Sequence, residues 1–349
     1  MRRLFAAEDV LLISSAVNRR AVHGPYFFEV FTVINFVIIT LLLMRITPAP
    51  VRTMPSILMS MIPAFVLQTA AGVGIRALVA WRQGRGRDYG AILRSPAWLI
   101  DTARIIIFSA LSVHTYSWIK LSMPLLHPRL FDQELWDIDR AIFFGHSPNI
   151  FFLDLFSNRA MLRLIDVSYG NVFLASLIIA SAFFGSAPSR RVRVAFTDSN
   201  TAMWIVGAWL YMLLPSLGPA YRFPDVWLAL ASVLAHTQEL QRILMTNYQA
   251  VLQFRRGVNA PVNILYGVAA FPSLHVAFEM LVVLWMRRVW RPGEVLFWIF
   301  FVIIFLGSVI TGWHYLIDSL AGIVLAWVCY AVAVRAWRID RWVAIRGRR

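Results

Sequence analysis

Two histidines lie at the edges of apolar stretches that are long enough to enter a membrane. His275 belongs to the stretch FPSLHVAFE, residues 271–279, and His314 belongs to GWHYLID, residues 312–318. Asp318 follows His314 by four positions, a spacing that places two side chains on one face of a helix. Because an ionisable group at membrane depth is costly and usually faces a cavity or a partner, these residues are the first candidates for chemistry.

A histidine pair with a nearby carboxylate suits nucleophilic transfer with acid–base assistance. A carboxylate such as Asp318 can fix the tautomer of one imidazole and leave its other nitrogen free to attack. A second histidine can protonate a leaving oxygen and later deprotonate an acceptor. Ser273, which follows Pro272, can offer its hydroxyl beside the N–H groups of a helix N-terminus, an arrangement that favours an anion. The sequence has no GxSxG nucleophile elbow, so phosphate chemistry fits better than carbonyl chemistry.

The composition is that of an integral membrane protein. Of 349 residues, 59% are hydrophobic and 15% are charged, and the mean hydropathy is +0.66, whereas soluble domains have about 45–50% apolar and about 25% charged residues. The net charge of +15 is divided into short clusters between apolar runs. We therefore interpret these charges as topology signals and expect no nucleic-acid partner. Cys329 is the only cysteine, so no intramolecular disulfide can form.

Eight apolar segments have about the length that a helix needs to cross ~30 Å of hydrocarbon. Because a spanning segment must satisfy its own backbone groups, each is predicted to be helical. The predicted fold class is therefore all-α, a polytopic membrane bundle of about eight transmembrane helices, of which the fifth is the shortest. The segments are 27–44, 56–80, 97–118, 168–186, 201–215, 271–286, 294–312 and 315–336.

Arginine clusters predict how these segments are oriented. The clusters lie within residues 2–20, 82–94, 190–193, 287–291 and 335–349. With eight spans, all five fall on one side, and the positive-inside rule makes that side the cytoplasm. Both termini are then cytoplasmic. Since 32 of the 33 basic residues are arginine, we expect a GC-rich genome and a bacterial inner membrane.

The same topology brings the two histidines to one membrane depth. The sixth segment runs from outside to inside, so His275 lies only about 6 Å below its outer end. The seventh segment returns outward and ends near His314. A lone histidine would most simply make a structural hydrogen bond to a neighbouring helix. Two histidines at one level, with Asp318 beside one of them, instead favour an active site at the extracytoplasmic face.

Two long connections, residues 119–167 and 216–270, are predicted to lie outside. The first contains FDQELWDIDRAIFFG and then NIFFLDLFSNRAMLRLID, in which apolar residues recur at intervals of three and four. The second half of this connection predicts an amphipathic helix lying at the membrane interface. A packed loop helix is the alternative interpretation.

The motifs around both histidines resemble a known family. PSLH at 272–275, followed by GWHYLIDSLAG at 312–322, resembles the second and third signatures of the type-2 phosphatidic acid phosphatase superfamily. LPSLGPAY at 214–221 and the upstream FDQELWDIDRAIFFG are most similar to the inositol phosphorylceramide synthase branch, whose members transfer a phospho-headgroup between lipids. The resemblance covers about residues 130–335. With the predicted spans, we divide the chain into residues 1–129, which hold three N-terminal spans, and residues 130–349, a phosphatase-like catalytic bundle of five spans.

The resemblance also implies a role for each matching residue. His314 would be the nucleophile that forms a phosphohistidine, Asp318 its orienting carboxylate and His275 the acid–base partner, while Ser273 would hold a phosphoryl oxygen. The chain departs from the phosphatases at Ser308, where they place an arginine six residues before the nucleophile. The lysine and arginine of their first signature have no clean match. These departures favour a transferase, and a phosphatase with water as acceptor remains open.

Four further residues are candidates for contact with the substrate. A cation must meet the phosphate charge, and we consider Arg222, directly after GPAY, and then Arg255 and Arg256, all in the second outer connection. For each, a solvated arginine or one paired with lipid headgroups is the alternative. Glu279 lies one turn deeper than His275 and is predicted to accept a hydrogen bond from the N–H of its ring, which would favour the charged ring and tune His275 as the acid; pairing to a neighbouring helix is the alternative.

The predicted function is transfer of a phospho-headgroup between membrane lipids, with a lipid donor and a lipid or polyol acceptor. The resemblance implies no metal and no cofactor. A transporter would also carry intramembrane histidines and carboxylates. In this protein the ionisable groups gather at one membrane face and do not form a continuous path across the bilayer, which favours an enzyme. A catalytically inactive scaffold is a third interpretation, and it would require the motif residues to be present by chance.

Overall fold

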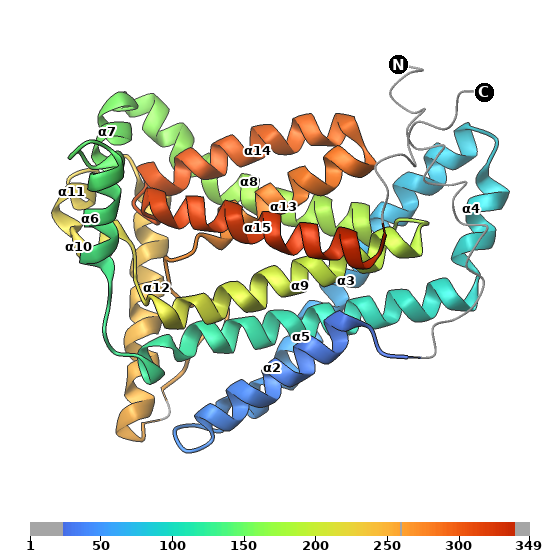
Figure 1. The fold of residues 1–349 in the computed structure, drawn as a ribbon, viewed down its shortest axis with the longest axis horizontal. Helices are drawn as coiled ribbons and strands as arrows, with labels where there is room; N and C mark the ends of the chain where they lie inside the picture. Colours follow the sequence, from blue (N-terminus) through green and yellow to red (C-terminus); the bar gives the residue numbers. More distant parts are fainter. Residues whose placement is uncertain (1–23, 259, 339–349) are drawn as a thin grey trace.

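The computed structural model describes residues 24–258 and 260–338, and these form helices and loops without a strand (Figure 1). Eight of the helices coincide with the eight predicted apolar segments, and most of them run along the long axis of the molecule. They are α2 (Phe27–Leu43), α3 (Ala49–Arg82), α5 (Pro96–Leu126), α8 (Arg159–Gly185), α9 (Arg190–Leu213), α13 (Leu274–Val289), α14 (Arg291–Ile310) and α15 (Leu316–Ala336).

Shorter elements close the two ends of this bundle. One end, called the inner end below, carries α4 (Gly86–Leu93) between α3 and α5. The opposite end, called the outer end, is covered by several short helices and by α12, which stands across the long axis (Figure 1). The outer elements are α6 (Asp132–Ile142), α7 (Pro148–Leu155), α10 (Pro219–Arg222), α11 (Pro224–Leu228), α12 (Ala235–Gln253) and the 3₁₀ turn Phe254–Arg256.

Five helices in the described part of the chain are long and apolar enough to cross a membrane, namely α3, α5, α8, α14 and α15. The other three candidates fall short in different ways. α2 is apolar but has 17 residues, and α13 has 16. α9 has 24 residues but carries three arginines in its first turn and the polar run TDSNT at residues 197–201. The all-helical fold is thus confirmed at the level of five membrane helices, and the count of about eight stays a prediction.

The first outer connection differs from the prediction at both of its ends. α5 continues to Leu126, so residues 119–126 belong to the helix and not to a loop. The predicted amphipathic helix is divided into α7 and the start of α8. The break comes where the Asn158 side chain accepts hydrogen bonds from the N–H groups of Ala160 and Met161, which makes it the N-cap of α8. Apolar periodicity alone did not reveal this cap.

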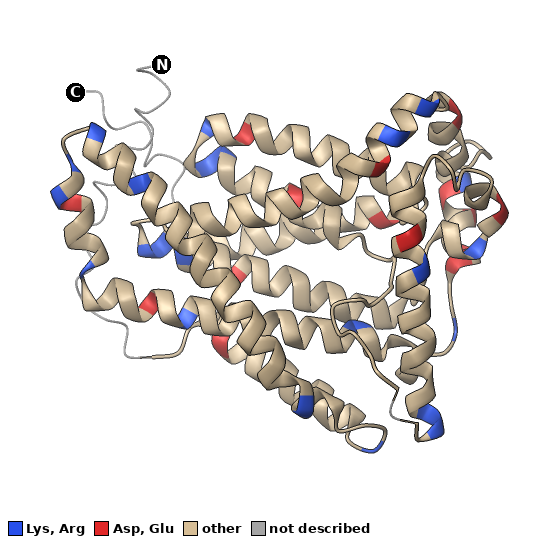
Figure 2. Cartoon of the chain, turned by 180° about the vertical axis from the view of Figure 1, so that it is seen from behind, with Lys and Arg blue, Asp and Glu red and all other residues tan. Residues whose placement is uncertain are grey.

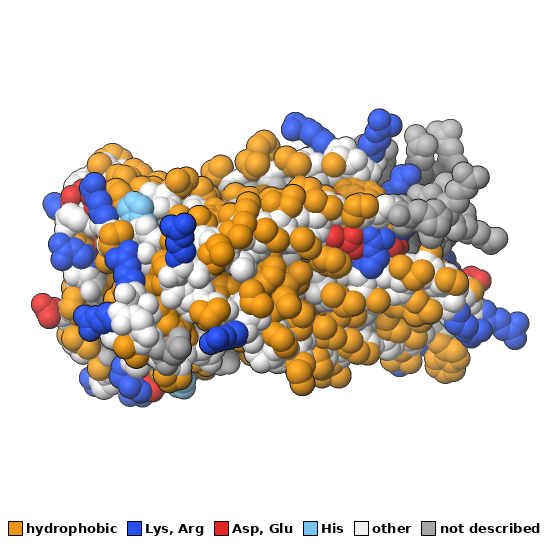
Figure 3. All heavy atoms as spheres, turned by 90° about the horizontal axis from the view of Figure 1, so that it is seen from below, with side chains coloured by type: hydrophobic (Ala, Val, Ile, Leu, Met, Phe, Trp, Pro, Cys, Tyr) orange, Lys and Arg blue, Asp and Glu red, His pale blue; other side chains and the backbone are white. Residues whose placement is uncertain are grey.

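On the face seen in Figure 3, an apolar belt covers the middle of the molecule, and most of the charged side chains in that view lie toward its two ends. Figure 2 shows where the charged residues lie along the chain. Large exposed side chains such as Met59, Leu67 and Ile75 of α3 and Val324 of α15 contribute to this belt. Exposed apolar surface of this extent is typical of a face that contacts lipid. The apolar helices and this exposed belt are features of an integral membrane protein.

A buried ion network joins three helices at the inner end. The guanidinium of Arg190 in α9 lies 2.8 Å from Asp101 of α5, which also accepts a hydrogen bond from the Tyr26 hydroxyl at 2.6 Å. Arg104 of α5 pairs with Glu29 of α2 at 2.5 Å. Because each buried charge here has an opposite partner, the network fixes α2 and α9 against α5 with no isolated charge among these groups.

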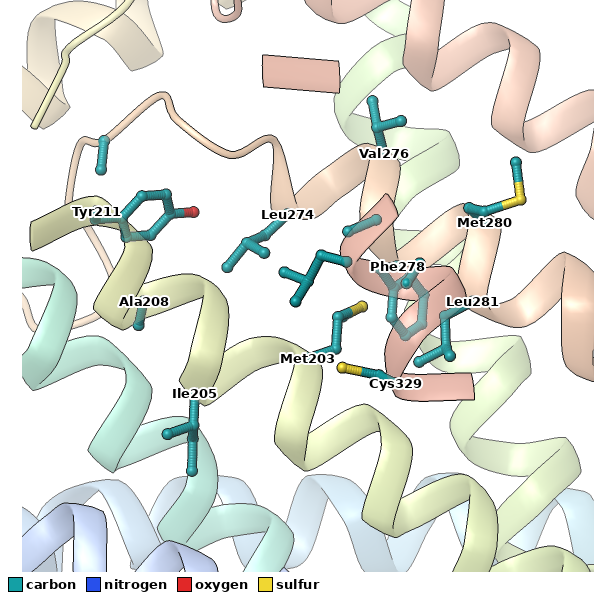
Figure 4. Packing of buried hydrophobic residues seen from close by; sticks show 14 of the residues in the cluster. Met203, Ile205, Ala208, Tyr211, Leu274, Val276, Phe278, Met280, Leu281 and Cys329 are labelled. Atoms are coloured by element: carbon teal, nitrogen blue, oxygen red, sulfur yellow. The ribbon is translucent and has the colours of Figure 1, made fainter. Parts of the chain in front are cut away.

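The core lies around α9, which packs against α2, α5, α13 and α15. In Figure 4, Met203 of α9 lies close to Cys329 of α15, and Phe278 and Leu281 of α13 lie on the same side. Gly207 lets the first residue of α13 approach closely, because a Cβ at this position would come within 2.3 Å of the Leu274 side chain. The start of α13 is therefore held firmly between α9 and α15.

α13 and α15 approach most closely at Gly322. A Cβ at this position would lie 2.3 Å from the carbonyl oxygen of Ser273, which is a backbone atom and cannot move aside cheaply. The two helix starts that carry the histidine motifs therefore depend on a glycine at 322 for their contact.

We expect Gly322→Ala to destabilise the folded protein by roughly 1–3 kcal/mol, because the added methyl group must push α13 and α15 apart. Gly74→Ala in α3 is the matched control, since a Cβ at this position would have nothing within 4 Å and alanine favours a helix interior over glycine by up to about 1 kcal/mol. Thermal unfolding in detergent measures both. Equal shifts in the melting temperature would contradict the packing argument.

Candidate active site

His314 lies in the loop of residues 311–315, between α14 and α15. Gly312 in this loop has a φ of +75°, and a Cβ there would approach the Trp227 ring to 2.5 Å. The carbonyl of Gly312 accepts a hydrogen bond from the N–H of Ala220 at 3.0 Å. The loop is therefore shaped by a glycine that has a left-handed conformation and no room for a side chain.

One nitrogen of the His314 ring is held by acceptors. Its Nδ1 lies 2.9 Å from the carbonyl oxygen of Ala270 and 3.4 Å from Oδ2 of Asp318. Since a carbonyl can only accept, Nδ1 must carry the proton in the neutral ring. The lone pair is then on Nε2, as a nucleophilic imidazole requires.

Asp318 has two neighbours besides the ring. Its Oδ2 accepts a hydrogen bond from the N–H of Tyr315 at 2.8 Å, which caps α15, and its backbone carbonyl accepts from the N–H of Ser273 at 2.9 Å. The sequence predicted Asp318 as the orienting group for His314. In the structure the Ala270 carbonyl is the nearer partner of the ring, so the carbonyl and the carboxylate share that position.

His275 lies in the first turn of α13 and faces the other histidine. The ring centroids of His275 and His314 are 6.0 Å apart. The Nδ1 atom of His275 lies 3.1 Å from the hydroxyl of Tyr169, and the Phe173 ring packs against its face at 4.2 Å between centroids. The two imidazoles, 39 positions apart in sequence, thus come together at the outer end of the bundle.

Ser273 is the N-cap of α13 and is fully buried. Its hydroxyl oxygen lies 3.5 Å from the N–H of Val276, a long hydrogen bond. The residue therefore lies at a helix N-terminus beside His275, where the predicted contact with a phosphoryl oxygen would be made. That contact stays a prediction.

Lys120 is the described cation whose charge reaches the rings of both His275 and His314, and the sequence analysis missed it. The ammonium lies over the rings of Tyr211 and Tyr116, 5.5 and 6.0 Å from their centroids. No hydrogen bond or ion pair of Lys120 with another described residue is present. The sequence does contain a signal for this residue, because Lys120 is the only lysine among 33 basic residues.

The three predicted arginines lie at the exposed outer end and do not contact either histidine within the described chain. Arg222 donates a hydrogen bond to the side chain of Gln133 at 3.2 Å. Arg255 donates to the carbonyl of Leu125 at 2.6 Å, and Arg256 is exposed. These guanidinium groups therefore lie at the rim of the outer end.

Glu279 does not pair with His275 in the structure. One of its oxygens accepts a hydrogen bond from the Ser176 hydroxyl of α8 at 2.9 Å, and the other has no partner among the described residues. The Tyr169 hydroxyl lies at Nδ1 of His275. The prediction of a direct contact between Glu279 and the His275 ring is therefore wrong. Glu279 instead pairs with a neighbouring helix, as the alternative interpretation expected.

Asp132, at the start of α6, holds the loop that follows α9. Its carboxylate accepts hydrogen bonds from the N–H groups of Leu217 and Gly218 at 3.1 and 2.8 Å, and from the Tyr315 hydroxyl at 2.9 Å. Gly218 has a φ of +109°, and a Cβ there would come within 2.4 Å of the Trp313 carbonyl oxygen. One carboxylate thus joins the LPSLGPAY segment to the loop of His314.

Asp139 and Asn149 hold the same loop from its outer side. The Asp139 carboxylate accepts hydrogen bonds from the N–H groups of residues 316–317 at 2.6 and 2.8 Å. The Asn149 amide of α7 donates to the carbonyls of Val309 and His314 at 2.7 and 3.0 Å. Both side chains are fully buried. They were not among the predicted site residues, because they act on the backbone and belong to no catalytic motif.

Comparison with known proteins now assigns a family. A family model described as the PAP2 superfamily matches residues 133–332, more than half of the chain. The chain belongs to the PAP2 superfamily. Both histidines lie within the match, whereas Lys120 lies just before it. Membership indicates a lipid enzyme of the phosphatase or phosphotransferase type.

No curated protein and no solved structure matches this PAP2 chain. The inositol phosphorylceramide synthase branch and the roles of individual residues therefore rest on the motifs and the geometry described above.

We expect Asp139→Asn to lower kcat about tenfold or more with a smaller effect on KM, because losing a charged acceptor on two N–H groups costs about 1.5–3 kcal/mol and loosens the turn after His314. Burial raises the pKa of Asp139 to about 6, so its carboxylate is charged only above that pH. The activity of the unmodified protein should then fall as the pH drops through about 6.

The pH dependence of kcat, measured for both proteins, checks this expectation, and the variant should lack the step near pH 6. Asp137→Asn on the exposed side of the same helix is the matched control. If Asp137→Asn and Asp139→Asn behave alike, the positioning role of Asp139 is wrong.

Proposed function

We propose that this PAP2 protein is a metal-independent lipid phosphotransferase that moves a phosphate-bearing headgroup between membrane lipids through a phosphohistidine on His314. The observation that carries the proposal is the meeting of His275 and His314, with ring centroids 6.0 Å apart and Lys120 beside both. A phosphorus atom placed between the rings has a nucleophile on one side and an acid on the other.

In the first step, Nε2 of His314 attacks the phosphorus of the donor lipid. The N–P bond forms as the bond from phosphorus to the donor oxygen breaks, and protonated His275 gives its proton to the departing alkoxide. The Ala270 carbonyl and Asp318 support this step, since they face the Nδ1 proton and stabilise the positive charge that develops on the ring.

In the second step, an acceptor hydroxyl takes the place of the departed lipid. Neutral His275 removes its proton while its oxygen attacks phosphorus, and the N–P bond to His314 breaks. His275 is again protonated and His314 is again neutral, so the cycle returns both rings to their starting state. The phosphoryl charge is met by Lys120 and by the N-terminus of α13 at Ser273. The exposed part of the headgroup is contacted by the outer arginines Arg222, Arg255 and Arg256.

Two features favour transfer over hydrolysis. His314 is only 4% exposed beneath the outer helices, and a covered site limits the water that would compete with a lipid hydroxyl. The motifs are also most similar to the inositol phosphorylceramide synthase branch, so we infer a synthase-like activity. A lipid phosphate phosphatase is the second candidate, because the same two steps with water as acceptor hydrolyse the donor.

We infer that the inner end faces the cytoplasm and the active site faces the opposite side of a bacterial inner membrane. The arginine clusters at the ends of α3, α13 and α15 and at the start of α9 support this orientation.

We expect His314→Ala to lower kcat by a factor of about 10³ or more, because alanine removes the nucleophile that the proposed mechanism uses. The purified protein is incubated with lipid extracts labelled with ³²P, with and without added polyols, and mass spectrometry identifies the product. His236→Ala, an exposed histidine of α12, is the control. An active His314→Ala variant would refute the mechanism, and a product that is always free phosphate would favour the phosphatase.

We expect Lys120→Met to lower kcat by a factor of about 10² or more, because the methionine keeps the length of the side chain and removes the charge that meets the phosphoryl group. Arg222→Met, at the exposed rim, should change kcat less than fivefold on the same scale. Steady-state kinetics with one lipid phosphate measures both. If the larger loss of kcat follows Arg222→Met, the cation has been assigned to the wrong residue.

A further inference from the structure

A cavity of about 250 Å³ lies inside the bundle between α3, α5, α8 and α9. Its lining residues on α5 recur every three or four positions and share the face of the helix that carries Lys120. They are Ile105, Ile106, Ser109, Ser112, Val113, Tyr116 and Ser117. The cavity therefore extends inward beneath the ammonium group of the candidate active site.

Aromatic side chains connect the cavity to the histidine pair. Tyr116 lines the cavity and lies under the Lys120 ammonium, and the Trp204 ring packs edge-on against it at 5.0 Å. Phe278, a second lining residue, packs at 6.0 Å against Phe173, whose ring touches His275. One aromatic ring thus lies between the cavity and the Lys120 ammonium, and two lie between the cavity and His275.

Four buried hydroxyl groups line this cavity without a partner in the described chain. Ser112, Ser117 and Thr201 are 6%, 3% and 2% exposed, and Thr69 of α3 is 8% exposed. Their side chains make no hydrogen bond to another described residue. A buried hydroxyl without a partner costs about 1–3 kcal/mol, so a group that accepts or donates hydrogen bonds is expected beside these residues.

The hydroxyl groups closest to Lys120 lie at the depth of the linkages of a membrane lipid. At 1.5 Å per residue, Ser117 and Ser112 lie about 4.5 and 12 Å inward from Lys120 along α5. A lipid whose phosphate lies at Lys120 has its ester or amide linkages at about this depth. Further inward the walls are mixed, because Phe65, Phe184 and Phe196 alternate with the hydroxyl side chains of Thr69, Ser109, Ser181 and Thr197.

We propose that this cavity binds one hydrocarbon chain of the lipid substrate, with the carbonyl of its ester or amide linkage hydrogen-bonded by a hydroxyl group of the set Ser112, Ser117 and Thr201. The proposal rests on the proposed function, because it takes the phosphate position from that mechanism. The volume is below the range of about 300–1,000 Å³ that holds a whole drug-sized ligand. It therefore suits a single chain, and any second chain remains in the bilayer.

Cross-linking locates the chain without requiring turnover. A diacyl lipid phosphate with a diazirine at the end of one acyl chain is photolysed with the full-length protein in nanodiscs, and the labelled peptides are sequenced. Label on inward-facing residues of α5, α8 and α9, competed by the unmodified lipid, supports the cavity. Label only on lipid-facing residues such as Ile107, which is 45% exposed, overturns the proposal. This result is obtained even if no lipid phosphate is turned over, so it is separate from the test of the function.

Filling the cavity should discriminate between chain lengths. Ser109→Phe places a ring in the space, and we expect about a tenfold loss of kcat/KM with a sixteen-carbon substrate and less than a twofold loss with a four-carbon one. Ile107→Phe, on the lipid-facing side of the same helix, is the control and should change neither value. Equal losses for both chain lengths would overturn the proposal.

The hydroxyl groups are tested by the linkage of the substrate. The variant with Ser112→Ala, Ser117→Ala and Thr201→Val should lose about tenfold in kcat/KM with an ester-linked lipid phosphate. It should lose much less with an ether-linked lipid of the same length, which lacks the carbonyl. A structural role for the hydroxyls would affect both lipids equally, and that result would refute the assigned contacts.

Discussion

A single backbone hydrogen bond joins the two helix starts that form the candidate active site. The N–H of Ser273, at the start of α13, donates to the carbonyl of Asp318 in the first turn of α15. Gly322 permits the approach, since any side chain there would collide with the Ser273 carbonyl. His275 and His314 lie within a few residues of this bond on either side. Their facing geometry therefore follows from backbone contact and does not require that the rings attract each other.

Buried acids serve different purposes at the two ends of the molecule. At the inner end Asp101 and Glu29 pair with guanidinium groups and join helices. At the outer end Asp132 and Asp139 bind backbone N–H groups of loops and of a helix start. A buried ion pair gives little net stability over an apolar pair, but removing one partner is costly. Carboxylates bound to N–H groups thus hold one conformation of the loop that carries His314, because any other would leave them unpaired.

Sequence reasoning was most accurate where one physical constraint acts alone. Apolar length located the membrane helices, and helix rise with arginine positions brought His275 and His314 to one level. It was least accurate where two structures satisfy the same pattern. Apolar periodicity cannot tell one interfacial helix from two that meet at Asn158, and it cannot tell whether Glu279 faces the next turn or a neighbouring helix. Contacts such as that of Asp139 with residues 316–317 join segments far apart in sequence, and no local motif signals them.

The single lysine illustrates how a site can select one cation over another. The rest of the basic residues are arginine, so a general preference for arginine does not explain position 120. The lysine stem packs against Gly267, where a Cβ would lie 3.1 Å from it, and its ammonium lies over two tyrosine rings. A guanidinium is wider and carries five donors in a fixed plane, whereas an ammonium is a compact charge with three. In a narrow space walled by aromatic rings, the smaller cation leaves room for a phosphoryl group and has fewer donors to satisfy when none is bound.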